Sequence, residues 1–498
     1  MGDVVRDLPV ALATRGWQPA VLTPAYGMFA SLRGAALLAT IEVSFAGAIQ
    51  AVDLYEVPGA DASVRHYALD HPLFTPRGPG LIYCDDETEA PFATDASKFA
   101  FFCAAAAAAL IAGALPAPRI IHLHDWQTAL FLALREFEPA YAALKKIHTV
   151  FTIHNMSVQG VRPLAGDKSS LRTWFPRLHF RQNAVTDPRW PDCVNPLAVA
   201  IRLADGLNTV STAYAREILE PSAPERGYSG GEGLQADLKK AAANGRLAGI
   251  LNGCNYPDKR LRRPGWGRLL AAMRAEVTRW IARETQMASA HYFADRQLAK
   301  LSARRPDALL TSVGRIAGQK SRLFREQAAD GRNALEGILA KLGAGGLFVM
   351  LGNGEPEYEM FLAETAATHA NFIFLRGYSD GLAQQLYAGG DLFLMPSSFE
   401  PGGISQMLAM RAGQLCVVHG VGGLKDTVTD NVNGFVFDGL TSRAQASNFV
   451  ARVTAALELR KSSAQRWRQM QQAAAAMRFD WNSSAAAYEK VLYGIDGS

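Results

Sequence analysis

The sequence has little net charge, no compositional bias and no long basic run. Its 498 residues include 51 Lys and Arg against 46 Asp and Glu, and no basic run is interleaved with aromatic residues. This argues against a nucleic-acid partner. The 44 glycines and 24 prolines follow no fixed period, which excludes collagen-like and low-complexity chains. With 49% hydrophobic and 19% charged residues, the chain is also too apolar to be disordered.

Cysteine is scarce, and the cysteines lack the CxxC spacing of metal and redox sites. The odd number and wide scatter of these residues predict reduced thiols in a cytoplasmic protein. The N-terminus also lacks the charged, apolar and small-residue pattern of a signal peptide. The cysteines are Cys84, Cys103, Cys193, Cys254 and Cys416.

Residues 99–118 carry no charge, and about 20 apolar residues is the length of a membrane span. The run of alanines at 104–109 gives little driving force for entering lipid, and a strand-like sequence follows at 119–124. We therefore expect a buried helix of an α/β domain here rather than a membrane span.

Short apolar or β-branched runs alternate with longer helical stretches along most of the chain, which is typical of parallel sheets built from βαβ units. A basic helical stretch at about 260–304 interrupts the alternation. The sequence thus predicts two doubly wound α/β domains joined by a connector. The predicted strands are residues 20–23, 120–124, 148–153, 207–210, 247–251, 309–313, 347–351, 372–375, 392–395 and 416–418.

In such sheets ligands bind beyond the carboxyl ends of the strands, and the space between two sheets is the usual site. Polar residues follow the predicted strands in the way this rule requires. They include Asp125, His154, Asn252, Arg315 and Glu400.

Arg315 and Lys320 lie five positions apart in a glycine-containing loop, where two cations can converge on one diphosphate. The alternative is a solvated basic loop. Glu400 precedes a Pro-Gly-Gly turn, in which Gly402 and Gly403 expose backbone N–H groups to an anion. The alternative for this segment is a charged helix cap.

Three further residue types are ambiguous when taken alone. His154 ends an apolar strand and is either a functional group or a satisfied core histidine. Tyr378 either stacks on a nucleobase or caps the sheet. His122 and His124 alternate on one strand, but no third ligand stands at a suitable spacing, so no metal site is expected.

Together these segments resemble the bacterial glycogen and starch synthases of glycosyltransferase family 5. The likeness runs in order along nearly the whole chain, and Phe-Glu-Pro-x-Gly is its most specific piece. The matching segments are residues 2–9 (GDVVRDLP), 122–128 (HLHDWQT), 152–160, 204–215, 249–253 (GILNG), 315–320, 399–406 (FEPGGISQ) and 422–428 (GGLKDTV).

The resemblance implies an α/β protein of the GT-B fold, with two Rossmann-like domains facing across a cleft. It implies retaining transfer of glucose from ADP-glucose to the non-reducing 4-hydroxyl of an α-1,4-glucan, in glycogen synthesis and without metal or cofactor. The implied division is an acceptor-side domain at 1–256, a helical connector at 257–307, a nucleotide-sugar domain at 308–478 and a returning helix at 479–498.

On the donor side, the resemblance implies that Arg315 and Lys320 neutralise the departing diphosphate. Glu400 would bind the glucose hydroxyls and stabilise positive charge on the sugar, and Tyr378 would stack on the adenine. The groups expected to donate to phosphate oxygens are Gly402, Gly403 and Ser405.

On the acceptor side, the resemblance implies that Asp125, His154 and Asn155 line the glucose and acceptor sites. Asp3 and Asn252 would lie nearby. A same-fold enzyme such as a nucleotide-sugar epimerase is an alternative, but the turn after Glu400 and the pairing of Asp125 with His154 argue against it.

The chain departs from the family at its start. Family members carry an apolar strand and a Lys-x-Gly-Gly-Leu loop directly before the Gly-Asp-Val-Val segment, which here begins at Gly2. We therefore expect the first domain to lack a central strand and to leave neighbouring backbone groups unpaired. Either the start is assigned too late, or the chain is a truncated, weak or inactive glucan-binding homologue. Ser321 also replaces a usual glycine, which requires a negative φ there.

Overall fold

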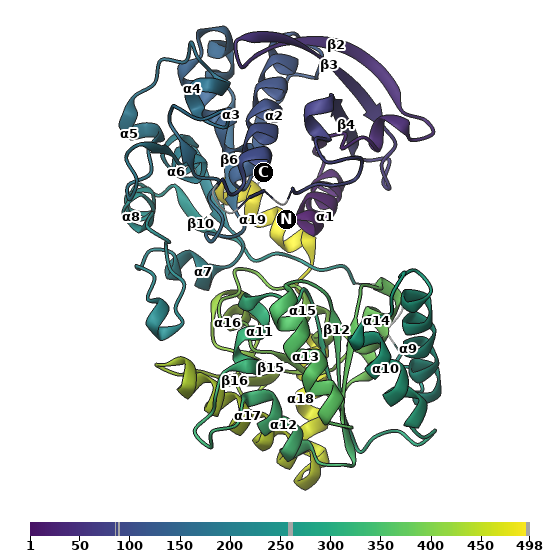
Figure 1. Cartoon of the computed structure of the whole chain (residues 1–498). Coiled ribbons are helices and arrows are strands. Elements are labelled where there is room, and N and C mark those ends of the chain that lie inside the picture. The colour runs from purple at the N-terminus through teal and green to yellow at the C-terminus, as the bar shows by residue number, and fades with distance from the viewer. Residues whose placement is uncertain (85, 88–89, 257–261, 495–498) are drawn as a thin grey trace. The chain divides into compact units, whose positions relative to one another are not determined.

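The computed structural model describes residues 1–84, 86–87, 90–256 and 262–494 (Figure 1). The chain forms two compact units. Unit 1 comprises Met1–Ser222, Gly230–Gly253 and Trp481–Ser498, and unit 2 comprises Ala223–Ser229 and Cys254–Asp480. Both are built of β-strands and helices, as the sequence predicts, and each is described separately below.

The first sheet of unit 1 has the strand order β1-β4-β3-β2. β1 runs parallel to β4, while β3 is antiparallel to both of its neighbours. The pairing of β1 with β4 is parallel, and the antiparallel hairpin of β2 and β3 is an addition that the sequence did not predict. The strands are β1 (Ala20–Pro24), β2 (Ala36–Phe45), β3 (Ala48–Val57) and β4 (Arg65–Asp70).

The second sheet of unit 1 has the order β10-β9-β6-β5, and all its pairs are parallel. All four strands are predicted by the sequence, although β9 and β10 end one and two residues earlier than expected. The strands are β5 (Ile120–His124), β6 (His148–Ile153), β9 (Gly206–Thr209) and β10 (Leu247–Gly249), with a small separate pair of β7 (Arg162–Pro163) and β8 (Cys193–Val194).

α2 contains the uncharged stretch of the sequence. It is long and apolar enough to cross a membrane, but 78% of its most apolar window is buried inside the protein. Its alanines at 104–109 belong to the main core of unit 1, together with Phe101 and Phe131. A core helix is what the sequence predicts here. The helices of unit 1 are α1 (Gly2–Thr14), α2 (Ala93–Ile111), α3 (Trp126–Phe137), α4 (Leu171–Trp174), α5 (Gln182–Val185), α6 (Pro196–Leu203), α7 (Thr212–Glu217), α8 (Gln235–Ala243) and α19 (Trp481–Val491).

The two ends of the chain meet in unit 1, where α1 and α19 share a second apolar cluster that includes Leu8 and Tyr488. Glu489 of α19 accepts from Arg15 at 2.6 Å and from the Trp17 indole at 2.7 Å. The returning C-terminal helix is thus part of the first unit (Figure 1).

Unit 2 contains one six-stranded sheet in the order β13-β12-β11-β14-β15-β16, and every pair is parallel. This is the order of a doubly wound nucleotide-binding sheet, in which connections diverge on either side of β11 and β14. Only β16 was not predicted. The strands are β11 (Ala308–Val313), β12 (Gly346–Gly352), β13 (Phe372–Arg376), β14 (Leu392–Met395), β15 (Leu415–His419) and β16 (Gly434–Phe437).

The predicted helical connector forms two helices of unit 2, apart from residues 257–261, which lie outside the described residues. Trp280 of α9 packs closely on Gly377, directly after β13. Arg263, just before α9, pairs with the buried carboxylate of Asp391 at 2.5 Å. The helices of unit 2 are α9 (Trp266–Ile281), α10 (Ser289–Lys300), α11 (Gly318–Arg325), α12 (Ala334–Leu342), α13 (Pro356–Thr368), α14 (Asp380–Gly389), α15 (Ser405–Arg411), α16 (Gly422–Thr427), α17 (Ser442–Ser462) and α18 (Ala464–Ala476).

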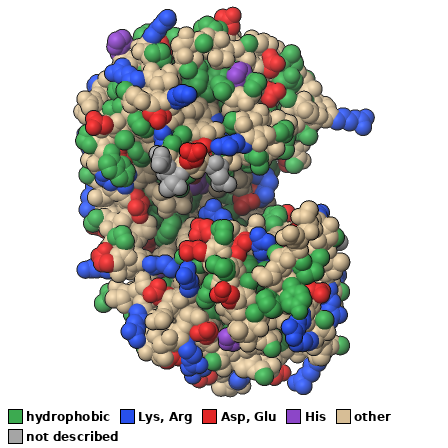
Figure 2. Space-filling view, viewed as in Figure 1, with side chains coloured by type: hydrophobic (Ala, Val, Ile, Leu, Met, Phe, Trp, Pro, Cys, Tyr) green, Lys and Arg blue, Asp and Glu red, His purple; other side chains and the backbone are tan. Residues whose placement is uncertain are grey.

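Basic and acidic side chains are interspersed over the face shown in Figure 2, without a large patch of one sign. Basic and acidic side chains, which are nearly equal in number in the sequence, are thus also mixed with one another on this face.

Candidate active site

A compact ionic cluster lies at the switch point of the unit 2 sheet, which is the carboxyl edge of β11 and β14 where the connections diverge. Lys320, in the first turn of α11, places its Nζ 3.1 Å from Glu400 Oε2. The hydroxyl of Ser397, which follows β14, donates to the same carboxylate oxygen at 2.8 Å. Glu400 is only 6% exposed, so its carboxylate is fixed by two donors in a mostly dry setting.

Arg315 lies on the loop between β11 and α11, and its side chain is exposed. Together with Lys320 and Ser397 it lines one small cavity at the carboxyl ends of β11, β12 and β14. The two cations and the carboxylate predicted from the sequence are therefore brought to one place. Ser321 lies inside α11, where helical backbone has a negative φ, so the condition set by the sequence is met.

The turn after Glu400 contacts a second pair of glycines, Gly422 and Gly423. Gly423 donates its N–H to the carbonyl of Glu400 at 2.9 Å. A Cβ at Gly422, whose φ is +45°, would lie 2.0 Å from that carbonyl oxygen, and one at Gly423 would lie 2.3 Å from the carbonyl oxygen of Gly402. The close approach of these two segments therefore requires glycine at both positions. It also fixes the position of Glu400 relative to the sheet.

The predicted phosphate-binding residues continue from this turn into α15. Gly403 has a φ of +57°, and its carbonyl accepts from the side chain of Gln406 at 2.9 Å. Ser405 begins α15, with its hydroxyl oxygen 3.2 Å from that of Tyr387. The segment from Gly402 to Ser405 is thereby held by side chains of two helices, Gln406 of α15 and Tyr387 of α14.

Tyr378 lies on the loop after β13, at the same edge of the sheet as the ionic cluster. Its ring is 74% exposed, and its hydroxyl donates to Asp380 at 2.5 Å. Ser379 caps α14 by accepting from the Leu382 N–H at 3.3 Å. A short capped turn therefore presents the ring to solvent.

In unit 1, Asp125 and His154 follow the neighbouring strands β5 and β6. Asp125 Oδ1 accepts from the backbone N–H of His154 at 2.7 Å, and Asp125 itself has a φ of +56°. Burial raises the pKa of Asp125 to about 6. His154 Nε2 lies 3.1 Å from His124 Nδ1, and burial lowers the pKa of His154 well below its usual value. The pair thus places a carboxyl group that titrates near neutrality beside a neutral imidazole.

The other predicted residues of unit 1 lie near strand ends or on α1. Asn155 is half-buried and accepts from the Ser157 N–H at 2.9 Å. Asn252 is 7% exposed, and its buried Oδ1 has no partner among the described residues. Asp3 is exposed on α1, paired with Arg6 at 2.9 Å. Within the described part of unit 1, no hydrogen bond joins Asp3 or Asn252 to Asp125.

Comparison with known proteins decides the family. Residues 1–240 match the starch synthase catalytic domain, and residues 298–474 match glycosyl transferases group 1. A glycogen synthase of Anaeromyxobacter sp. is 35% identical, over 99% of this chain and 96% of its own length. The glycogen synthase of Streptococcus gordonii is 31% identical over the same shares. This chain belongs to the glycogen and starch synthase family.

The structural comparison agrees with this family. The catalytic domain of starch synthase IV from Arabidopsis thaliana, solved with ADP and acarbose bound, has a TM-score of 0.74 and 26% identity. The match covers 99% of this chain and 95% of that one. The predicted family, the GT-B fold and the glucosyltransferase activity of glycogen synthesis are therefore confirmed.

Two residues of this candidate site were given no role from the sequence. Ser397 donates to Glu400, and its carbonyl oxygen lies 2.9 Å from Nδ1 of the buried His419. Burial lowers the pKa of His419. The available signal was positional, since Ser397 follows β14 and His419 ends the adjacent strand β15.

The imidazoles of β5 are engaged with the protein itself. His122 has Nδ1 2.9 Å from the Tyr493 hydroxyl and Nε2 2.7 Å from the Thr152 hydroxyl. Among the described residues, no group of three or more His, Cys, Asp or Glu side chains is arranged to hold a metal ion.

Proposed function

We propose that this enzyme transfers glucose from ADP-glucose to the non-reducing 4-hydroxyl of an α-1,4-glucan, with retention of the anomeric configuration, in the cytoplasm. The proposed reaction uses no metal and no organic cofactor. The observation that carries the proposal is the convergence of Lys320, Glu400 and Arg315 at the switch point of a doubly wound sheet.

The two cations can stabilise the negative charge of the leaving diphosphate. Cleavage of the bond between the sugar and the diphosphate leaves negative charge on the phosphate oxygens. Arg315 offers a planar fork of donors, and Lys320 offers a point charge. Backbone N–H groups at Gly402 and Gly403 add aligned dipoles. Charges fixed in advance in this way stabilise the transition state without reorganisation.

The carboxylate of Glu400 can stabilise the positive charge of the reacting sugar. As the C1–O bond breaks, positive charge develops on the anomeric carbon and ring oxygen. A carboxylate held by Lys320 and Ser397 keeps its position while that charge develops. Its second oxygen, Oε1, is proposed to accept from glucose hydroxyls.

A retaining transfer on one face of the sugar needs no separate general base. The departing phosphate oxygen takes the proton of the acceptor hydroxyl as the new C1–O4 bond forms. In unit 1, Asp125, His154 and Asn155 are proposed to bind sugar hydroxyls on the acceptor side, with Asp3 and Asn252 beside them. Tyr378 is proposed to stack on the adenine, for which its exposed ring is suited.

The direct test is release of ADP from ADP-glucose in the presence of glycogen, with UDP-glucose as the competing donor. We expect ADP release, and we expect the lengthened chains to be digested by an α-1,4-specific glucanase. Preference for UDP-glucose would overturn the donor assignment. Retention on amylose without turnover would identify an inactive glucan-binding homologue instead.

Glu400→Gln tests the role of the carboxylate. Removing one preorganised charge at the reacting centre should lower kcat by about 100-fold or more, with little change in thermal stability. Glu357→Gln, at an exposed position on α13 that pairs with Arg325 at 3.3 Å, is the matched control and should keep full activity. A Glu400→Gln enzyme with kcat within twofold of the parent value would refute the role.

A further inference from the structure

The loop that presents Tyr378 is held by the two connector helices of unit 2. α9 and α10 lie together along one side of this unit, and α10 packs against β13, the strand that leads into the loop (Figure 1). The four residues from Arg376 to Ser379 carry the chain past the carboxyl end of β13. Three of these four contact a side chain of the connector.

Arg376, the last residue of β13, is fixed through both its backbone and its side chain. Its carbonyl oxygen lies 2.7 Å from Nε2 of His291, on α10. Its guanidinium pairs with Glu359 of α13 at 2.6 Å and with Glu284, which follows α9, at 3.6 Å. The point at which the loop begins is therefore set by groups from several elements.

The residues on either side of Tyr378 are held by α9. A Cβ at Gly377 would lie 2.5 Å from Cε2 of Trp280, so the indole packs directly on the backbone there. The hydroxyl of Ser379 donates to Glu276 at 2.9 Å. The ring of Tyr378 itself is 74% exposed. The connector thus supports the backbone on both sides of a residue whose ring faces solvent.

The imidazole of His291 is buried between two acceptors. Nε2 faces the carbonyl oxygen of Arg376, and Nδ1 lies 3.1 Å from Oε2 of Glu284. The residue is only 2% exposed. A carbonyl oxygen can only accept a hydrogen bond, and so can an ionised carboxylate. Both ring nitrogens therefore carry a proton in this arrangement, which is the imidazolium form.

Glu284 is the ionised partner of this pair. Burial acts to raise its pKa, but hydrogen bonds from the Ala288 N–H and from His291, together with the charge of Arg376, lower it below its usual value. Trp280 also favours a cation at His291. Its ring stacks on the imidazole with centroids 5.9 Å apart and planes inclined by 26°, and the face of an indole attracts positive charge.

The charged groups around His291 come from four elements. Glu284 follows α9, Arg376 ends β13, and Glu359 of α13 pairs with Arg376. On α10 itself, Asp295 stands one turn further along and is exposed. The one neighbouring cation among these groups is thus neutralised by its own carboxylate partner, which leaves Glu284 to stabilise the imidazolium.

We propose that His291 is a positioning residue of the nucleoside site: as an imidazolium it links Glu284 to the carbonyl of Arg376 and so holds the loop that presents Tyr378 to the adenine. When the imidazolium loses a proton at higher pH, one nitrogen no longer donates, one of the two hydrogen bonds is lost, and the donor binds more weakly. The inference rests on the proposed function for the role of Tyr378, although the protonation of His291 does not depend on it.

The first test is equilibrium binding of ADP-glucose without glucan between pH 6 and pH 9. Both phosphates of this donor are esterified, so its charge is constant in that range. We expect the dissociation constant of the parent to rise by about fivefold or more with pH. His291→Gln keeps one donor but cannot titrate, so its dissociation constant should be intermediate and independent of pH. His369→Gln, just before β13, is the matched control and should follow the parent.

The second test leaves the buried cluster intact. Tyr378→Ala removes the exposed ring, so the variant should bind ADP-glucose more weakly and lose the pH dependence, because the two effects act through one contact. Nitrogen-15 NMR of the histidine-labelled parent needs no ligand. The His291 signal, identified by its loss in His291→Gln, should show two protonated nitrogens at pH 6 and one at pH 9.

Three outcomes would overturn the proposal. The first is a pH dependence in His291→Gln or Tyr378→Ala equal to that of the parent. The second is a neutral His291 imidazole at pH 6. The third is a fall in kcat of His291→Gln with unchanged donor binding, which would assign the residue to the chemical step. Failure of the proposed function is distinguishable, because the parent would then bind no ADP-glucose at any pH, whatever the NMR titration shows.

Discussion

Asp125 shows at the scale of one residue how a candidate binding residue opposes stability. Its carboxyl group is buried, its backbone occupies the left-handed region with a φ of +56°, and it accepts a hydrogen bond from the His154 N–H. Strain and desolvation of this kind persist where the surrounding structure enforces them. The position is consistent with a role in substrate binding rather than in packing.

Replacing Asp125 with Asn should stabilise the protein at neutral pH. A carboxyl whose pKa is about 6 in the folded state and 3.8 in the reference state is destabilising once ionised, by roughly 3 kcal/mol above pH 6. The penalty is absent below pH 3.8, because both states are then protonated. Asn keeps the acceptor oxygen and tolerates a positive φ.

The measurement is the unfolding midpoint of Asp125→Asn and of the parent between pH 4 and pH 8. We expect the unfolding midpoint of the variant to exceed that of the parent at pH 7.5 and the difference to vanish toward pH 4. Glucosyl transfer by the variant should fall. The buried His154 acts in the opposite sense, since its depressed pKa lowers stability as pH falls below 6.5. Only the difference between the two proteins isolates Asp125. The exposed Asp295→Asn is the control, and an equal gain there would contradict the assignment.

The sequence identified the charged residues of the candidate site better than the residues that support them. Lys320 stands out because it shares a glycine-containing loop with Arg315, and Glu400 stands out because it precedes a Pro-Gly-Gly turn. Ser397 and His419 do not, since hydroxyls and imidazoles at strand ends are common. Their roles depend on which strands are neighbours, and the order β11-β14-β15 is a property of the folded sheet.

At the scale of secondary structure elements, the contact between two loops determines the position of the carboxylate. The start of α16 supplies the Gly423 N–H to the carbonyl of Glu400, and neither Gly422 nor Gly423 leaves room for a Cβ. The two segments approach closely enough for this hydrogen bond only because both positions are glycine. A substitution at Gly422 or Gly423 should therefore displace Glu400 and lower the activity of the enzyme.

Gly422→Ala tests this coupling. The new methyl group meets the Glu400 carbonyl oxygen, and alanine resists a φ of +45°, so we expect a loss of roughly 1–3 kcal/mol in stability. Displacement of Glu400 should lower kcat more than it changes KM for the donor. Gly381→Ala, in α14, has no atom within 4 Å of its new Cβ and should be neutral or slightly stabilising. Normal kcat and stability in Gly422→Ala would refute the coupling.

Parallel strands were predicted well, and antiparallel ones were not. Buried parallel strands are continuous apolar runs, as at 120–124 and 347–351, and are visible without context. β2 has its buried residues at alternate positions only near its end. Its hairpin turns at Ala46 and Gly47, both with positive φ, where Asn-Gly or Asp-Gly would have signalled the turn. Alanine in that conformation gives no such signal.

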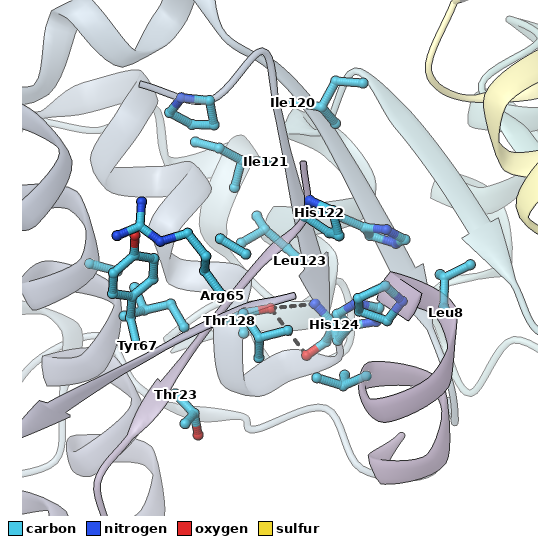
Figure 3. Close-up of a pocket in the computed structure, with 18 of the residues that line it drawn as sticks. Leu8, Thr23, Arg65, Tyr67, Ile120, Ile121, His122, Leu123, His124 and Thr128 are labelled. Carbon is cyan, nitrogen blue, oxygen red and sulfur yellow. Dashed lines mark hydrogen bonds between the residues drawn. The ribbon is translucent and has the colours of Figure 1, made fainter. Parts of the chain in front are cut away.

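At the scale of the whole molecule, two units with separate cores differ in completeness. Unit 2 has one continuous six-stranded sheet. Unit 1 has two four-stranded sheets whose edge strands β1 and β5 each have a single partner among the described residues, and both strands line a cavity of about 1750 Å³ (Figure 3). Unpaired strand edges around an empty cavity lower the free energy of local opening. We therefore expect unit 1 to be less stable than unit 2.

Heating should accordingly unfold unit 1 first. Calorimetry should show two transitions, and hydrogen exchange during the lower one should expose β1 and β5 while β11 and β14 stay protected. Loss of protection in unit 2 at the lower temperature would contradict this order.

The packing of α19 on α1 also has a consequence for synthesis on the ribosome. The apolar cluster of α1 is completed by Trp481 and Tyr488, which are translated only after Cys254–Asp480. At about 5–20 residues per second, the ribosome needs roughly 10–45 seconds to make that intervening stretch. During this interval the ribosome makes nearly all of unit 2, while the first-made unit still exposes the surface that later packs against α19. The nascent enzyme therefore finishes its first domain last, and chaperones have that interval in which to bind the exposed surface.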